Sequence, residues 1–319
     1  MLLRHCTLRD HAAPVDVLIR AGRIEAIAPH IEAGDEPVIE CEGRLVTPPF
    51  VEPHIHLDSV LTAGQPRFNR SGTLFEGIDI WGERKASLSA EDVRARALEA
   101  LRLLASYGTL YVRTHVDTTE PTLTALDALL ALREEVRGWI TLQVVAFPQN
   151  GIYSKAGHDD LLEEAVRRGA DVVGGIPHYE LTREDGVRSV QRTFDLAEQY
   201  GRLIDIHCDE VDDEQSRFLE VMVAEAIKRA EAGRIAPERI TASHTTAFGS
   251  YNDSYATKLL GFLRRTAINV IANPLINITL QGRTDSYPRR RGVTRVKELW
   301  RNGVNVALGE DCIFDPWYI

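Results

Sequence analysis

The stretch FVEPHIHLD, residues 50–58, is a largely apolar run that ends in two histidines, His54 and His56. Alternate side chains of a strand point to the same face, so both imidazoles can reach one metal ion. A single His-x-His pair is weak evidence, because a chain with ten histidines can contain such a pair by chance. The question is therefore whether other strands end in the same way.

Seven further stretches repeat this pattern of an apolar strand that ends in polar side chains. The eight predicted strands are LVTPPFVEPHIH (45–56), TLYVRTHVD (109–117), WITLQVVAFPQ (139–149), DVVGGIPH (171–178), LIDIHCDE (203–210), RITASHTT (239–246), AINVIANP (267–274) and VNVALGED (304–311). Helical signals lie between them: Ser89 with Asp92 as a capping box, Pro121 at a first helical position, and glycines after the expected helix ends at 108, 169, 201, 233 and 303. This alternation is typical of a (β/α)8 TIM-type barrel or of an open doubly wound sheet.

Polar residues recur at the C-terminal end of nearly every predicted strand, which favours the barrel, because its one active-site face collects them. They are His54, His56, His115, Asp117, Gln149, His178, His207, Glu210, His244, Asn273 and Asp311. A single buried histidine is more often a core residue, but core histidines have no reason to gather at one end of the strands. Three histidines and a carboxylate are typical of an open, catalytic metal site, whose ion makes hydroxide available at neutral pH. For His115 and Asp117 we expect a supporting role behind such a site.

The first 48 residues differ from the rest, because VDVLIR and RIEAIAP flank the turn AG, and PVIECEG and RLVTP continue in short strands. We therefore expect a small β-subdomain over residues 1–48 and the barrel over residues 49–319. Residues 57–88 are expected to form a long loop that covers the substrate.

Composition narrows the classes of function. Proteins that bind nucleic acids or anionic membranes usually have a basic surface, and the net charge of -10 argues against one. It favours a small-molecule substrate. The N-terminus has no apolar signal-peptide core, and no run approaches the ~20 apolar residues of a membrane span, so we expect a cytoplasmic protein. Four scattered cysteines without C-x-x-C argue against a disulfide framework and against a thiolate zinc site.

The His-x-His pair is accompanied by AGQP, SGTLFEGI, VRTHVD, AFPQ, GADVVGGIPH, LIDIHCDEVDDEQSRF, ASHTTA, ANPLIN and LQGR. Together these motifs resemble the bacterial cytosine deaminases of the amidohydrolase superfamily over nearly the whole chain. The resemblance implies one divalent metal ion, Fe2+ or Zn2+, with the ligands His54, His56, His207 and Asp311. It further implies Glu210 as the acid for the ring nitrogen, His244 and Asp311 as the groups that orient and deprotonate water, Gln149 as the reader of the pyrimidine carbonyl edge, and Leu74 and Trp317 as pocket walls.

The implied reaction is the hydrolytic deamination of cytosine to uracil and ammonia, as in pyrimidine salvage, and a homo-oligomer is compatible with the sequence. Two departures from the family pattern stand out. The residue directly after Asp311 is Cys312, where the family has a second acidic residue. We expect Cys312 to contact the substrate, and because a thiol and a carboxylate differ in charge and in hydrogen bonding, the substrate preference stays open. The sequence ends at Ile319, soon after strand 8, where family members continue, so we expect a truncated barrel.

Other functions remain as alternatives. They are deamination of a related amino-pyrimidine, oxopurine or aminotriazine, and a non-catalytic scaffold that kept the barrel. A binuclear amidohydrolase such as a hydantoinase or dihydroorotase needs a lysine at the end of strand 4, and DVVGGIPH has none. The unrelated deaminases with H-x-E and P-C-x-x-C are excluded, because that signature is absent.

Overall fold

The computed structural model describes residues 1–318, which fall into two compact units, Met1–Phe50 and the chain from Val51 onward. The small unit is a four-stranded sheet in the order β3-β2-β1-β4. Its strands are β1 (Leu2–Cys6), β2 (Val15–Arg20), β3 (Arg23–Ala28) and β4 (Val38–Glu40). As predicted, β2 and β3 form a hairpin, and its turn residues Ala21 and Gly22 both have positive φ, which suits a tight hairpin turn.

One strand of this unit was not predicted, and one expected strand was wrong. The central strand β1 was not singled out in the sequence, since LLRHC lacks a clear alternation of apolar and polar residues. Residues 44–48 form one bridge, between Leu45 and Thr7, instead of a strand. The prolines at 48 and 49 explain this difference, because a proline has no N–H to donate to a ladder.

The larger unit contains an eight-stranded sheet in which sequential strands are neighbours, from β12 to β5. Its strands are β5 (Phe50–Ile55), β6 (Thr109–Asp117), β7 (Thr141–Phe147), β8 (Val172–Gly175), β9 (Leu203–Cys208), β10 (Ile240–His244), β11 (Asn269–Ala272) and β12 (Val306–Leu308). Pairing is parallel from β6 through β12. The first strand meets the segment after the last: Asp311 N donates to His54 O at 2.8 Å, and His56 N donates to Asp311 O at 3.1 Å. The (β/α)8 barrel is confirmed.

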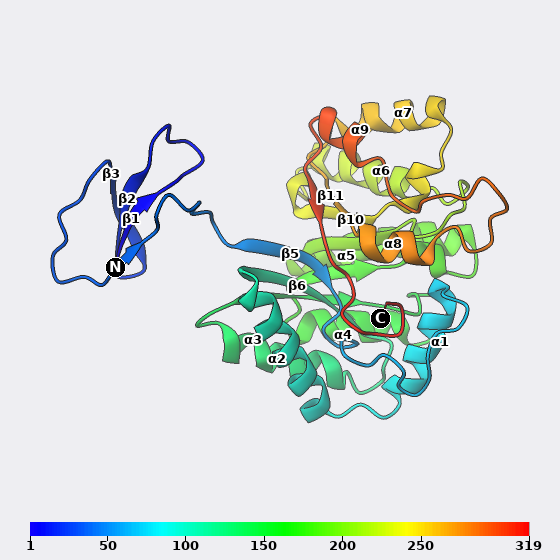
Figure 1. Cartoon of the computed structure of the whole chain (residues 1–319). Helices are drawn as coiled ribbons and strands as arrows, with labels where there is room; N and C mark the ends of the chain where they lie inside the picture. The colour runs from blue at the N-terminus through cyan, green and yellow to red at the C-terminus, as the bar shows by residue number, and fades with distance from the viewer. Residues whose placement is uncertain (319) are drawn as a thin grey trace. The chain divides into compact units, whose positions relative to one another are not determined.

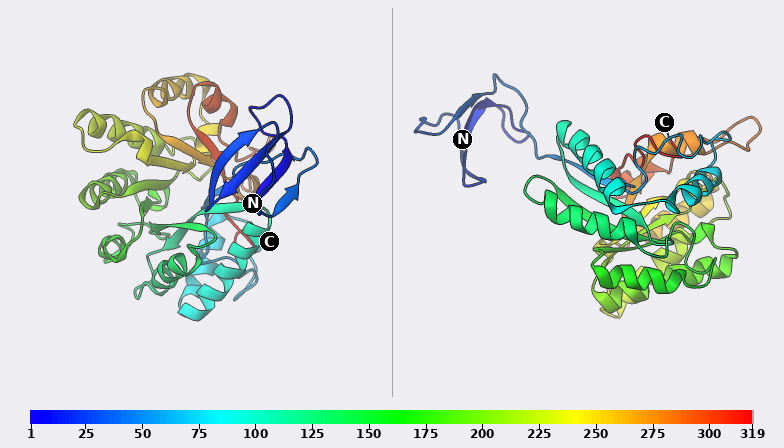
Figure 2. Two further views of the ribbon diagram at one scale, coloured as in Figure 1. Left: turned by 90° about the vertical axis from the view of Figure 1, so that its left-hand side faces the viewer. Right: turned by 90° about the horizontal axis from the view of Figure 1, so that it is seen from below.

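Helices surround the strands on the outside, as the end-on view in Figure 2 shows. They are α2 (Ala90–Ser106), α3 (Thr124–Val136), α4 (His158–Arg168), α5 (Arg183–Tyr200), α6 (Phe218–Glu231), α7 (Asp253–Leu263) and α9 (Val296–Arg301). Ser89 caps α2 by accepting the N–H of Asp92, and Gly169 and Gly201 end α4 and α5 in the left-handed conformation, all as predicted. The position of Pro121 was wrong, because α3 begins only at Thr124, after Leu123 in the left-handed region.

Two more helices, α1 (Leu74–Lys85) and α8 (Pro274–Leu280), lie at the end toward which the strands point (Figure 1). Residues 57–88 are therefore not the loop that we expected, because α1 occupies much of them. Thr73 caps this helix by accepting the N–H of Glu76, so the motif T-x-x-E at 73–76 was a start signal that could have been recognised.

Short 3-10 helices complete the larger unit at Pro177–Tyr179 (η1), Pro237–Arg239 (η2) and Thr246–Gly249 (η3). Across the described chain, every cysteine is a buried free thiol. Within residues 1–318, none of the helices has both the length and the apolar character to cross a membrane.

Candidate metal centre

Three strand ends bring the four expected ligands together. His54 and His56 lie at the end of β5, His207 on β9, and Asp311 just after β12. His54 Nε2 lies 2.8 Å and His56 Nε2 3.5 Å from Asp311 Oδ1, and the Nε2 atoms of His56 and His207 are 3.1 Å apart. His244, at the end of β10, stands in place of His56 in one group that could hold an ion: one ligand atom each from His54, His207, His244 and Asp311 lie within 4.8 Å of one another, while His56 groups in the same way with His54 and His115. The cluster can hold a metal ion.

The hydrogen bonding of these atoms tests whether a cation fits. His54 Nε2 and Asp311 Oδ1 are buried and lie 2.8 Å apart, but the contact lacks hydrogen-bond geometry, and neither atom has a hydrogen-bond partner among residues 1–318. The same holds, in the described chain, for His207 Nδ1. Because buried polar atoms are nearly always satisfied in proteins, such unpaired atoms are suited to binding an ion or water. Imidazole nitrogens with one carboxylate oxygen suit a divalent ion of borderline softness.

Burial and the contacts among these groups together set the charges in the cluster. Burial lowers the pKa of His54 to about 4 and that of His244 to about 3, so both imidazoles are neutral near pH 7. Burial alone would raise the pKa of Asp311, but its contacts with His54 and His56 hold that pKa well below the usual range. Neutral imidazoles and an ionised carboxylate are the forms that bind metal ions.

Glu210 lies beside the cluster in the segment that follows β9. Its Oε1 is 3.2 Å from His244 Nδ1 and accepts a hydrogen bond of 3.3 Å from Asn277 Nδ2. Burial, reinforced by the charge of Asp311, raises the pKa of Glu210 well above its usual value. This shift favours the protonated form of Glu210, and Nε2 of its neighbour His244 is 3.8 Å from Asp311 Oδ1.

The expected pocket walls enclose a small space above the cluster. Gln149, Leu74, Trp317 and Cys312 all line it, together with His56, His207, Glu210, Leu280 and Asp311. Trp317 Nε1 donates to the backbone oxygen of Leu74 at 3.1 Å, which joins the end of the chain to α1. Gly77 is required here, because a Cβ at this position would lie 2.2 Å from Trp317 Cδ1.

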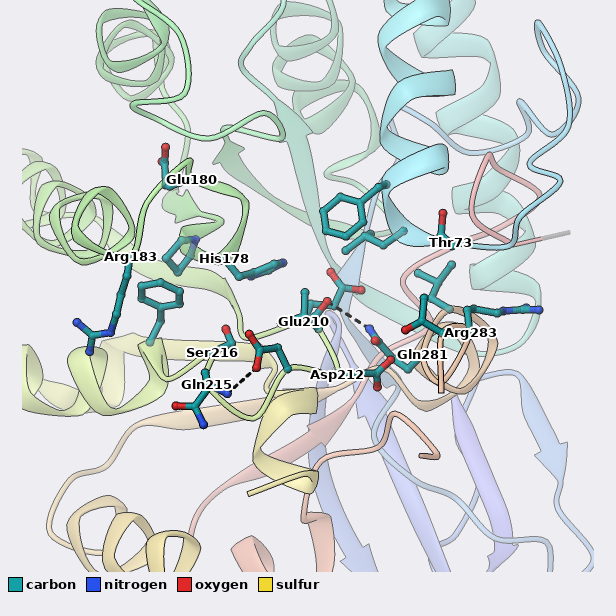
Figure 3. Close-up of a pocket in the computed structure, with 18 of the residues that line it drawn as sticks. Thr73, His178, Glu180, Arg183, Glu210, Asp212, Gln215, Ser216, Gln281 and Arg283 are labelled. Atoms are coloured by element: carbon teal, nitrogen blue, oxygen red, sulfur yellow. Dashed lines mark hydrogen bonds between the residues drawn. The ribbon is translucent and has the colours of Figure 1, made fainter. Parts of the chain in front are cut away.

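A larger cavity of about 590 Å³ adjoins this space and shares Leu74, Glu210 and Leu280 with it. His178 and Glu210 both border the cavity, as Figure 3 shows. His178 was grouped with the strand-end residues, yet it does not belong to the metal cluster: it lies on η1, and neither ring nitrogen has a hydrogen-bond partner in the described part of the chain.

The remaining strand-end residues have other surroundings. His115 lies against His54, with ring centroids 3.9 Å apart, and Asn273 Nδ2 lies 3.2 Å from His244 Nε2. Asp117 accepts hydrogen bonds from Trp81 Nε1 and from Lys85 Nζ of α1, at 3.1 Å and 2.8 Å, and so holds the covering helix.

Sequence reasoning did not single out Phe147, whose ring stacks on His207 at 3.9 Å, or Asn277. Asn277 stood within the recognised motif ANPLIN, which was the available signal.

Comparison with known families agrees with this geometry. A sequence profile described as "Amidohydrolase family" matches residues 37–319. A curated pterin deaminase from Rhizobium rhizogenes is 29% identical over 95% of this chain and 68% of its own length.

Two solved structures are also similar. One is a 5-methylcytosine deaminase from Klebsiella pneumoniae liganded with 5-fluorocytosine, with a TM-score of 0.95 and 52% identity over 100% of this chain and 76% of that one. The other is an N-isopropylammelide isopropylaminohydrolase from Burkholderia multivorans, with a TM-score of 0.79 and 28% identity over 99% of this chain and 75% of that one.

Proposed function

Because the chain belongs to the amidohydrolase family, we propose that it hydrolytically deaminates cytosine, and cytosines with a substituent at ring position 5, to the corresponding uracil and ammonia. The observation that carries the proposal is the small pocket in which Gln149 and the buried acid Glu210 face the metal cluster. The 52% identity to a 5-methylcytosine deaminase supports the choice of ring. The process would be pyrimidine salvage in the cytoplasm, with a free nucleobase as substrate.

One divalent ion, Fe2+ or Zn2+, would be held by His54, His56, His207 and Asp311. When bound, such an ion lowers the pKa of a water ligand toward ~7 and so supplies hydroxide at neutral pH. The unpaired Nε2 of His54 and Oδ1 of Asp311 are the atoms that best fit this role.

The chain's own residues would then bind the ring and move the protons. Glu210, whose protonated form is favoured by burial and by the charge of Asp311, donates a proton to the ring nitrogen next to the carbon that bears the amino group. His244 is neutral and lies between Glu210 and Asp311, so it can orient the attacking water and accept its proton. The carboxylate of Asp311 takes the proton of the hydroxyl group that has added to the ring carbon and passes it to the departing ammonia, and the proton on His244 returns to Glu210, 3.2 Å away. Gln149 holds the ring carbonyl edge.

Apart from the reacting molecule, water must be kept from the pocket while these transfers occur. Trp317 and the start of α1 provide this cover, because their mutual hydrogen bond spans the pocket beside Leu74. Cys312 lies in the same wall, where the substituent of the ring would be accommodated.

The test is ammonia release by the metal-loaded protein. The panel would be cytosine, 5-methylcytosine, 5-fluorocytosine, isocytosine, guanine, pterin and an aminotriazine, with the products identified by chromatography. We expect the cytosines to give the highest kcat/KM and the corresponding uracils as products. A preference for pterin or the triazine would replace the substrate assignment, and no turnover of any compound by metal-loaded protein would support the scaffold alternative.

A further inference from the structure

A chain of buried polar side chains runs from the metal cluster toward the opposite end of the barrel. His54 Nδ1 lies 3.0 Å from Ser243 Oγ, which in turn donates to Asp205 Oδ1 at 2.6 Å. Arg113 Nη1 donates to Asp205 Oδ2 at 2.7 Å. The side chains of His54, Ser243 and Asp205 are all inaccessible to solvent. None of the proposed catalytic steps uses Ser243, Asp205 or Arg113.

The register of the barrel brings these residues together. Asp205 and His207 share a face of β9, and Ser243 of β10 pairs with His207. Arg113 of β6 also donates from Nε to Gln143 Oε1 at 2.7 Å, so its guanidinium is held in place from two sides. Asp205 is thereby fixed as an ionised carboxylate, which can only accept hydrogen bonds.

Counting protons along the chain determines the form of the imidazole. Ser243 has one hydroxyl hydrogen, and the carboxylate of Asp205 takes it. The contact between Ser243 Oγ and His54 Nδ1 is then a hydrogen bond only if Nδ1 carries the proton. A neutral imidazole with its proton on Nδ1 has a free lone pair on Nε2, the atom that faces Asp311.

We infer that Ser243 and Asp205 are positioning residues that hold His54 in the Nδ1-protonated form, so that Nε2 is always ready to bind the metal ion. The inference rests on the metal centre of the proposed function and adds to it the groups that prepare one ligand. Partners of this kind orient metal-binding histidines in many proteins, and their loss commonly weakens metal affinity 10- to 100-fold.

Two substitutions separate the parts of this arrangement. Ser243→Ala removes the acceptor for Nδ1, and we expect Zn2+ affinity to fall by roughly 10- to 100-fold in competition with a chelator. Asp205→Asn supplies an amide that donates to Ser243, which releases the hydroxyl proton toward Nδ1 and moves the imidazole proton to Nε2. In the metal-free protein, 15N chemical shifts of His54 should show this change of tautomer, a signal that a general loss of packing does not produce.

Matched variants control for stability. Ser189→Ala removes another buried hydroxyl, which donates to Gly186 O within α5, and it should leave Zn2+ affinity unchanged. Ser243→Thr retains the hydroxyl and should keep more affinity than Ser243→Ala. The melting temperature of each metal-free variant shows whether it has folded.

The outcomes are distinct. Wild-type protein that takes up no Zn2+ contradicts the metal centre itself. Zn2+ binding by Ser243→Ala that is as tight as the wild type overturns the positioning role, and this result does not depend on whether Asp205→Asn folds. Asp205 also faces His115 Nε2 at 3.6 Å. If Asp205→Asn lowers Zn2+ affinity as much in the Ser243→Ala background as in the wild type, the effect acts through His115. That result would reject the inferred chain of contacts.

Discussion

Asp16 and Asp311 are both buried aspartates whose pKa lies below the usual value, but they are held in opposite ways. Asp16, in the small sheet, accepts backbone N–H groups from His5 at 2.9 Å and Ile31 at 3.0 Å. Asp311 Oδ1, in the barrel, has no hydrogen-bond partner in the described chain and faces the rings of His54, His56 and His244.

This difference distinguishes a structural carboxylate from the carboxylate that we propose as a metal ligand. A buried group whose hydrogen bonds are complete stabilises the fold, and nothing further is needed to explain it. A buried polar group without hydrogen-bond partners costs free energy of folding. Where such a group faces other unpaired atoms, a bound ion can offset that cost. Substitution of Asp311 should therefore affect metal content and turnover, whereas substitution of Asp16 should affect the stability of the fold.

The largest effect should come from Asp311→Asn. Its amide cannot supply the negative oxygen ligand, so metal content measured by elemental analysis should fall from about one ion per chain to nearly none, with loss of turnover. Retention of the full metal content would remove Asp311 from the ligand set, and two ions per wild-type chain would contradict a mononuclear centre.

Glu210→Gln tests a neighbour of the cluster that we assign to proton transfer. The variant should keep its metal, while kcat falls by about 10² or more, the usual contribution of a general acid. Elemental analysis and steady-state kinetics on the same preparation measure both. If the ion is lost with the activity, Glu210 belongs with Asp311 as a ligand or a structural support.

Two roles are open to Cys312, contact with the substrate ring and packing. It lines the small pocket beside the cluster, and it also packs with Ile78, Trp81 and Trp317. If it faces the ring, Cys312→Asp should change the ranking of cytosine and 5-substituted cytosines by about 10- to 200-fold in kcat/KM, with metal content unchanged. An unchanged ranking with a lower melting temperature would instead make Cys312 a packing residue, since a buried charge destabilises the fold.

Asp16→Asn should have the smallest effect on function. The variant should lose roughly 1–3 kcal/mol of stability at pH 7, because an ionised acceptor of two N–H groups is replaced by a neutral one. Burial raises the pKa of Asp16, but the N–H groups of His5 and Ile31 and the charge of Arg4 outweigh it and hold the pKa below its usual value.

The stabilisation by Asp16 is therefore present above its unfolded pKa of about 3.9, and it is lost as the pH falls through the lower folded value. Melting temperatures of wild type and variant, measured from pH 7 to below pH 3, should draw together once the pH falls below about 4. A constant difference, or a change in metal content, would contradict the structural role of Asp16.

The barrel and most strand-end residues were predictable because their signals are local. An apolar run of strand length, a glycine after a helix and a capping serine each act within a few residues, as β9, Gly201 and Ser89 show. Parallel strands then bring their C-terminal ends to one edge, so His54, His207 and Asp311 could be expected to meet without knowledge of any side-chain position. Helix α1 also had such a signal, at Thr73 and Glu76, which was passed over.

The sequence alone determined the type of barrel and the residue types at its mouth, because strand periodicity and helix caps depend on neighbours along the chain. Only the tertiary structure decided that His244 stands between Glu210 and Asp311, and that Ser243 links His54 to Asp205. Contacts between residues so far apart in the chain depend on strand register and on rotamers in a close-packed interior. No local pattern encodes these contacts, because each exists only after the strands on both sides of it have taken their places.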